Sequence, residues 1–82
     1  MASDVRAFVV ERSADPSGIS GTGRVAVGAV MPTGAVALTW LTSVESKTWF
    51  DSLDDFLLVH VHPGTRVRFD DDPDRPIEGG VL

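Results

Sequence analysis

Residues 21–42 read GTGRVAVGAVMPTGAVALTWLT and predict a single β-hairpin. Two β-branched, apolar runs, residues 24–31 and 35–42, are separated by Pro32, Thr33 and Gly34. Proline presets φ to about −65° early in a turn, and glycine supplies positive φ later in the turn at no steric cost. The connection is therefore short, and the two strands run antiparallel.

Side chains alternate between the two faces of a strand, which assigns the faces of residues 35–42. Val36, Leu38 and Trp40 share one side, and the smaller, more polar positions between them share the other. We expect the side with the larger apolar groups to face the core.

Three further strands are predicted from short β-branched or alternating runs: Val5–Glu11, Lys47–Phe50 and Thr65–Asp70. In the last of these, Val67 and Phe69 are expected to point into the core. The arginines next to them, Arg66 and Arg68, are expected to point outward.

One short helix is predicted directly after Ser52, which is a good N-cap residue. Asp54 and Asp55 fall in the first turn, where the helix dipole favours negative charge. One apolar face at helical spacing is formed by Leu53, Phe56, Leu57 and His60. Pro63 and Gly64 end the helix, because proline cannot continue the backbone hydrogen bonding.

The 82 residues are enough for one small domain, whose stability depends on a few large side chains. The candidates for its core are Phe8, Trp40, Trp49, Phe50, Phe56 and Phe69. Trp40 is assigned to the core by the alternation of its strand. The short strand around Trp49 leaves two positions open for it: in the core, or exposed as an interface anchor.

Acidic residues concentrate at the C-terminus of a chain whose formal net charge is −5. Residues 71–82 combine Asp and Glu with proline and glycine, a composition with little apolar surface to bury. We expect residues 1–70 to form a single β-rich domain and residues 71–82 to form a flexible acidic tail. Without this tail the domain is nearly neutral.

The chain contains no cysteine, which excludes disulfides and thiolate metal sites and favours a reducing, cytoplasmic location. No apolar run approaches the roughly 20 residues needed to span a bilayer. The first residues, Met1 to Asp4, are not followed by the uncharged apolar core of a signal peptide. We therefore expect no membrane association.

Four cations, Arg24, Lys47, Arg66 and Arg68, could form a small basic strip on the outward sheet face. Such a strip would suit nucleic acid, although charged residues more often keep a sheet face in water and protect its edges. The negative net charge disfavours nucleic acid as the main partner.

His60 and His62 could supply two imidazoles to a metal ion, but no third ligand is fixed by their spacing. We therefore assign them to local packing and to the helix C-terminus. Gly18, Gly21 and Gly23 are not followed by the lysine and helix of a phosphate-binding loop. No catalytic serine or cysteine is placed by a motif either, so we expect no enzymatic activity and no cofactor.

Several segments together resemble a family of small uncharacterised proteins of actinobacteria, their phages and haloarchaea. These segments are Gly18–Ala26 with Gly28, the turn at Thr33-Gly34, Ser46, Asp51-Ser52, and the His60-Val61-His62 segment before the last strand. This chain has Val61 where the family pattern has glycine between the two histidines. The resemblance covers residues 6–70 and implies a shared architecture and a phage or actinobacterial origin, without implying an activity.

The sequence thus predicts a mostly β, α+β domain: a strongly bent antiparallel sheet of about five strands, or an SH3-like barrel, with one short helix before the last strand. The function we expect is that of a phage-related accessory module that binds another protein. Its candidate interface residues are Trp49, Arg66, Arg68, Lys47 and Arg24. A nucleic-acid-binding module and a small-molecule or metal-binding protein remain the alternatives, and an edge strand could join two copies of the chain.

Overall fold

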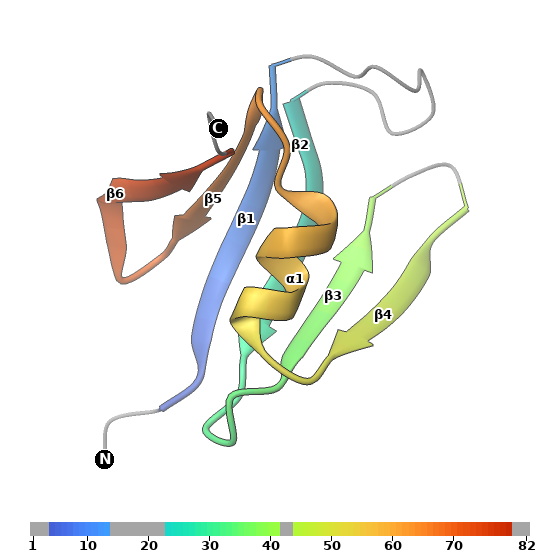
Figure 1. Ribbon diagram of the computed structural model, residues 1–82, viewed down its shortest axis with the longest axis vertical. Coiled ribbons are helices and arrows are strands. Elements are labelled where there is room, and N and C mark those ends of the chain that lie inside the picture. The colour runs from blue at the N-terminus through green and yellow to red at the C-terminus, as the bar shows by residue number, and fades with distance from the viewer. Residues whose placement is uncertain (1–3, 14–22, 42–43, 80–82) are drawn as a thin grey trace.

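The computed structural model describes residues 4–13, 23–41 and 44–79. Within these ranges the chain forms six strands and one helix in the order β1 (Arg6–Arg12), β2 (Gly23–Val30), β3 (Val36–Trp40), β4 (Ser46–Phe50), α1 (Leu53–His60), β5 (Thr65–Phe69) and β6 (Asp72–Glu78). The strands form one antiparallel sheet with the spatial order β4-β3-β2-β1-β5-β6 (Figure 1). The Gly18–Gly23 loop discussed above lies largely outside the described residues.

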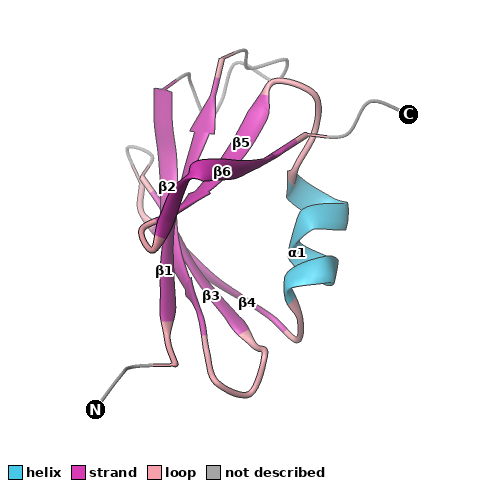
Figure 2. Cartoon of the chain, turned by 90° about the vertical axis from the view of Figure 1, so that its left-hand side faces the viewer, coloured by secondary structure: helices cyan, strands magenta, loops and turns pink. Residues whose placement is uncertain are grey.

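The sheet is strongly bent, and α1 lies across its concave face (Figure 2). The chain leaves β4 at one edge, passes through α1, and returns as β5 beside β1. The sheet is open, because β4 and β6 are its two edges and do not pair with each other. The bent antiparallel sheet is confirmed, whereas closure into an SH3-like barrel is not observed.

The β2–β3 hairpin forms as its sequence predicts. Its register runs from Ala26 opposite Trp40 to Val30 opposite Val36. At the turn, the Met31 amide donates to the Ala35 carbonyl at 2.7 Å, and Gly34 has a φ of 95°. Glycine is needed there because other residues rarely adopt this backbone conformation.

The core lies between α1 and the concave face of the sheet. Its buried apolar side chains are Phe8, Val10, Val25, Ala26, Val36, Leu38, Phe56, Val67 and Phe69. The Phe8 ring packs against those of Phe56 and Phe69, with centroids 5.5 and 5.7 Å apart. A Cβ at Gly28 would lie 2.6 Å from Cζ of Phe8 and 2.5 Å from the Ala37 carbonyl oxygen. Glycine at position 28 therefore makes room for the Phe8 ring.

A β-bulge in β2 adds a second buried side chain to this core. Val10 pairs with Ala26, but the next residue of β1, Glu11, pairs with Arg24. Val25 is thus the extra residue, and both Val25 and Ala26 are buried. Regular alternation would have placed one of the two on the opposite face.

The helix begins where its sequence predicts. The Asp55 amide donates to Oγ of Ser52 at 3.1 Å, which satisfies one of the free amides of the first turn. Phe56 is completely buried, and the ring of His60 packs against the core aromatic groups on the same face. The helix ends at His60, before the Pro63-Gly64 pair.

The prediction of an acidic tail from residue 71 is wrong for residues 72–78, which form the edge strand β6. Ile77 pairs with Val67 and packs against the core, and the Gly79 amide donates to the Thr65 carbonyl at 2.7 Å. The segment has too little apolar surface to fold alone, but β5 offers it a row of backbone partners. Its two prolines are tolerated because an edge strand leaves half of its amides unpaired. The helix therefore precedes the penultimate strand, and the folded unit extends past residue 70.

We predict that β6 contributes measurably to the free energy of unfolding. We expect Ile77→Ala to lower the free energy of unfolding by about 1–3 kcal/mol, because it removes apolar contacts that reach the core. Arg75→Ser, at an exposed position of the same strand, is the control and should change it by less than about 0.5 kcal/mol. Denaturant unfolding measures both values, and equal stability of the two variants would contradict the docking of β6.

Candidate functional site

The face of the sheet opposite α1, here called the outer face, is covered by no other described element (Figure 2). The cross-strand register arranges its central side chains in two rows. The first row consists of Trp49, Ala37, Ala29 and Ala7. The second consists of Lys47, Thr39, Val27, Val9 and Arg68. Both rows cross the sheet from the β4 edge toward β1 and β5.

The centre of the outer face is apolar. Antiparallel sheets with one face in water normally place polar residues on that face, which gives an alternating sequence. Here the positions between the ends of the rows are alanine, valine and one threonine, and a shallow depression lies over them. These central side chains are half-buried by their neighbours, and contiguous apolar patches that face solvent on small proteins are typical of interaction sites.

Trp49 lies at one end of the first row, with 66% of its surface exposed. Its neighbour Phe50 faces α1, where its ring centroid is 5.6 Å from that of Phe56. Because adjacent residues of a strand point to opposite faces, Trp49 must point to the outer face. The structure thus decides between the two positions that the sequence left open, and Trp49 is not part of the core.

The structure brings three of the four predicted cations, Arg24, Arg66 and Arg68, together around Glu11, and leaves Lys47 apart on β4. Arg66 pairs with Glu78 at 2.8 Å, Arg68 with Glu11 at 2.9 Å, and Lys47 with Glu45 at 3.5 Å. Within the described part of the chain, Arg24 is the one of the four without an ion pair; it lies opposite Glu11.

Lys47 is too far from the other three cations to continue them into a strip of four. Lys47 is on β4 and Arg68 is four strands away on β5, a separation of about 19 Å at the usual strand spacing. The outer face is therefore an apolar centre surrounded by cations that, with the exception of Arg24, are in ion pairs.

His60 is the last residue of α1, and its side chain packs against aromatic rings of the sheet. Its ring centroid lies 4.9 Å from that of Trp40 and 5.4 Å from that of Phe50. Its backbone carbonyl accepts a hydrogen bond from the Arg12 guanidinium at 3.3 Å. Burial lowers the pKa of His60, and the positive charges of Arg12 and His62 lower it further. The imidazole is therefore favoured in its neutral form.

His60 and His62 differ in their surroundings. His62 lies past the end of α1, is exposed, and its carbonyl accepts a hydrogen bond from the Thr65 amide at 2.9 Å. The described residues contain no group of three or more His, Cys, Asp or Glu side chains that could hold a metal ion. The packing role predicted for His60 is confirmed by its ring contacts, whereas hydrogen bonding of its imidazole to helix carbonyls is not seen.

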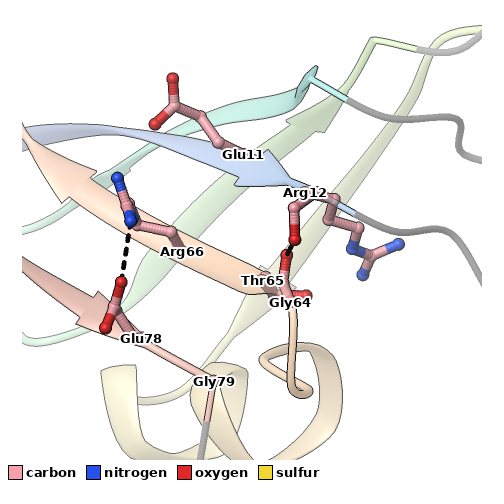
Figure 3. Close-up of a pocket in the computed structure, with 8 residues that line it drawn as sticks. Glu11, Arg12, Gly64, Thr65, Arg66, Glu78 and Gly79 are labelled. Carbon is pink, nitrogen blue, oxygen red and sulfur yellow. Dashed lines mark hydrogen bonds and ion pairs between the residues drawn. The ribbon is translucent and has the colours of Figure 1, made fainter.

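A second hollow lies where β1, β5 and β6 meet (Figure 3). It is lined by Glu11, Arg12, Ser13, Gly64, Thr65, Arg66, Glu78 and Gly79. Arg66 reaches toward Glu78, whereas the Arg12 guanidinium points away from that pair (Figure 3). Both the amide and the hydroxyl of Ser13 lie within hydrogen-bond distance of the Gly64 carbonyl. These polar groups hold the strand ends together.

Sequence reasoning missed the apolar residues at the centre of the outer face. The signal was available in residues 25–30, VAVGAV, where both alternating sets of positions are apolar. Such a run is typical of a strand with contacts on both faces. The described residues supply a cover for only one of these faces.

Fold and site together define a small open-sheet protein with one face covered by a helix and the other bare and apolar. The sequence model of a protein family described as Acb5 phage protein matches residues 5–71. Since this range is most of the chain, the protein belongs to that phage protein family. Comparisons with curated proteins and with solved structures gave no match. The phage part of the resemblance is confirmed, and an actinobacterial origin stays a prediction.

The half-buried His60 is expected to make the stability of the domain depend on pH. Because its folded pKa lies below the unfolded value of about 6.5, protonation favours the unfolded chain. The free energy of unfolding should therefore fall as the pH is lowered from 7.5 through 6.5 toward 5.5. Denaturant unfolding at these pH values should show a smaller decrease for His60→Gln. The exposed control His62→Gln should retain most of the decrease, because burial and Arg12 are the larger causes of the lowered His60 pKa. An unchanged slope in His60→Gln would contradict the assignment.

Because most of the predicted cations are in ion pairs, we predict weak or absent binding of nucleic acid. Binding of the phosphate backbone requires several clustered cations and weakens steeply with salt. We expect no change in fluorescence anisotropy of labelled duplex DNA or RNA at physiological salt. Salt-sensitive binding that is abolished by Arg66→Glu combined with Arg68→Glu would contradict this expectation and support the nucleic-acid alternative.

Proposed function

We propose that the protein is a non-enzymatic phage accessory factor that binds another protein through its outer face. The observation that carries this proposal is the bare apolar centre of the outer face, with the exposed Trp49 at its margin. Membership in a phage protein family supports an accessory role during infection.

The outer face has the composition of a protein interface. Such interfaces commonly have an apolar centre with few charges, an aromatic anchor, and a polar rim. Trp49 supplies a large, rigid anchor with little conformational entropy to lose. Lys47, Arg24 and Arg68, with Arg66 further out, supply the rim and restrict which partners fit.

A protein suits this surface better than the alternative ligands. Nucleic acid would have to displace the carboxylates that already pair with Arg66, Arg68 and Lys47. A metal or small molecule held by the two histidines would need His60 to leave its aromatic neighbours.

The expected partner is a host component. Among the described residues, no helix is long and apolar enough to cross a membrane. The absence of cysteine suits a reducing cytoplasm, so we propose that the encounter takes place there.

The proposal is tested by a charge placed in the centre of the outer face. Ala29→Lys should abolish capture of a specific host protein, because a lysine there would have to be desolvated in the interface. The matched control is Leu58→Lys on α1, where 84% of the leucine surface is exposed on the opposite side of the molecule. The measurement is affinity capture from host lysate with quantitative mass spectrometry, followed by calorimetry with the purified partner.

Thermal melts of both variants must match the parent, so that loss of binding reports on the surface. A partner retained by Ala29→Lys and lost with Leu58→Lys would place the interface on the helix. If no captured protein responds to Ala29→Lys, the outer face is not the binding site and the proposal fails.

A further inference from the structure

The two edges of the sheet differ in how open they are to pairing. Edge strands are commonly protected by proline and charge. β6 has the sequence DPDRPIE, with prolines at positions 73 and 76 and charges at four of its other positions. β4 has the sequence SKTWF, with no proline and with Lys47 as its single charge, so it is the less protected of the two edges. The β4 edge is therefore the one at which another strand can be added.

The hydrogen-bond pattern shows which backbone groups of β4 are available. The Met31 amide bonds to the Ala35 carbonyl and the Leu41 amide to the Val25 carbonyl, so the odd-numbered residues of β3 bond to β2. Residues 36, 38 and 40 must then bond to β4, at residues 50, 48 and 46. The amides and carbonyls of Lys47 and Trp49 consequently point away from the sheet, and no described residue bonds to them.

We propose that two copies of this chain pair antiparallel through β4, with Trp49 opposite Trp49 at the two-fold axis. Antiparallel pairing through a two-fold axis is the simplest closed arrangement that satisfies the free groups of both edges at once. The result is one continuous sheet in which the outer faces of the two copies adjoin.

Three antiparallel registers would use the free amides and carbonyls of Lys47 and Trp49. The charges near the β4 edge favour the one with Trp49 opposite Trp49. Lys47 opposite Lys47 sets two like charges side by side. Lys47 opposite Trp49 brings Glu45 of one copy opposite Asp51 of the other, again with like charges. Trp49 opposite Trp49 brings Lys47 twice to the level of Asp51, the residue that directly follows β4. Cross-strand pairs of opposite charge and of two aromatic rings are both stabilising, whereas like charges are destabilising.

The dimer should dissociate on dilution. A single strand pair is a small contact compared with the roughly 1,200–2,000 Å² buried in stable complexes. This inference does not rest on the proposed function, because it is argued from the backbone edge of β4 and is tested on the purified chain without a host partner. Trp49 and Lys47, which the proposed function places at the margin of the host interface, also lie on this edge strand.

Sedimentation velocity over a concentration series tests the pairing. The parent chain should shift from monomer to dimer as its concentration rises. Lys47→Asp and Asp51→Lys should each remain monomeric, because each places like charges opposite one another. The double variant restores opposite charges and should recover the dimer, which makes it the matched control for both single variants.

Two further measurements distinguish loss of the dimer from misfolding of the variants. Thermal melts should show that all three charge variants fold like the parent. Amide exchange followed by NMR should show Lys47 and Trp49 slowing as the parent concentration rises, with Thr48 and Phe50 unaffected. A parent that stays monomeric throughout, or a dimer that survives in both single variants, would overturn the proposal.

Discussion

The Phe56 ring packs against Phe8, with 5.5 Å between their centroids, and the arrangement of the whole molecule depends on this contact. It fixes α1 across the concave face and is possible only because Gly28 leaves room for the Phe8 ring. Phe69, Phe50 and His60 extend the same aromatic cluster toward both sides of the sheet. The helix α1, with eight residues, covers the concave face of the sheet. The described part of the chain contains no second helix that could cover the outer face.

That asymmetry connects the fold with the proposed function. The strands at the centre of the sheet are apolar on both faces, which is unusual for a sheet that has a helix on one side only. Retaining alanine and valine on a face in water costs solubility without adding to the core. A surface of this kind is explained if a partner covers it, and three of the four cations around it are held in ion pairs.

Local signals allowed most of the fold to be predicted from sequence. The hairpin follows from its turn residues, and the helix start follows from Ser52, because both depend on contacts a few residues apart. β6 was not predicted, since its strand depends on backbone partners in β5 and on the single apolar side chain of Ile77. Trp49 was not settled, because its face is decided by the contact of Phe50 with α1. The candidate rim residues were predicted, but the apolar centre between them was missed.

The most direct test of this account is the accessibility of methyl groups on the two faces of the sheet. NMR with a soluble paramagnetic gadolinium chelate measures it, since relaxation of a methyl group increases with its exposure to solvent. The account predicts strong relaxation enhancement for the outer methyl groups of Val9, Val27 and Ala29. The inner methyl groups of Val10, Val36 and Leu38 should be protected. Equal protection of both sets in the isolated chain would contradict a bare outer face.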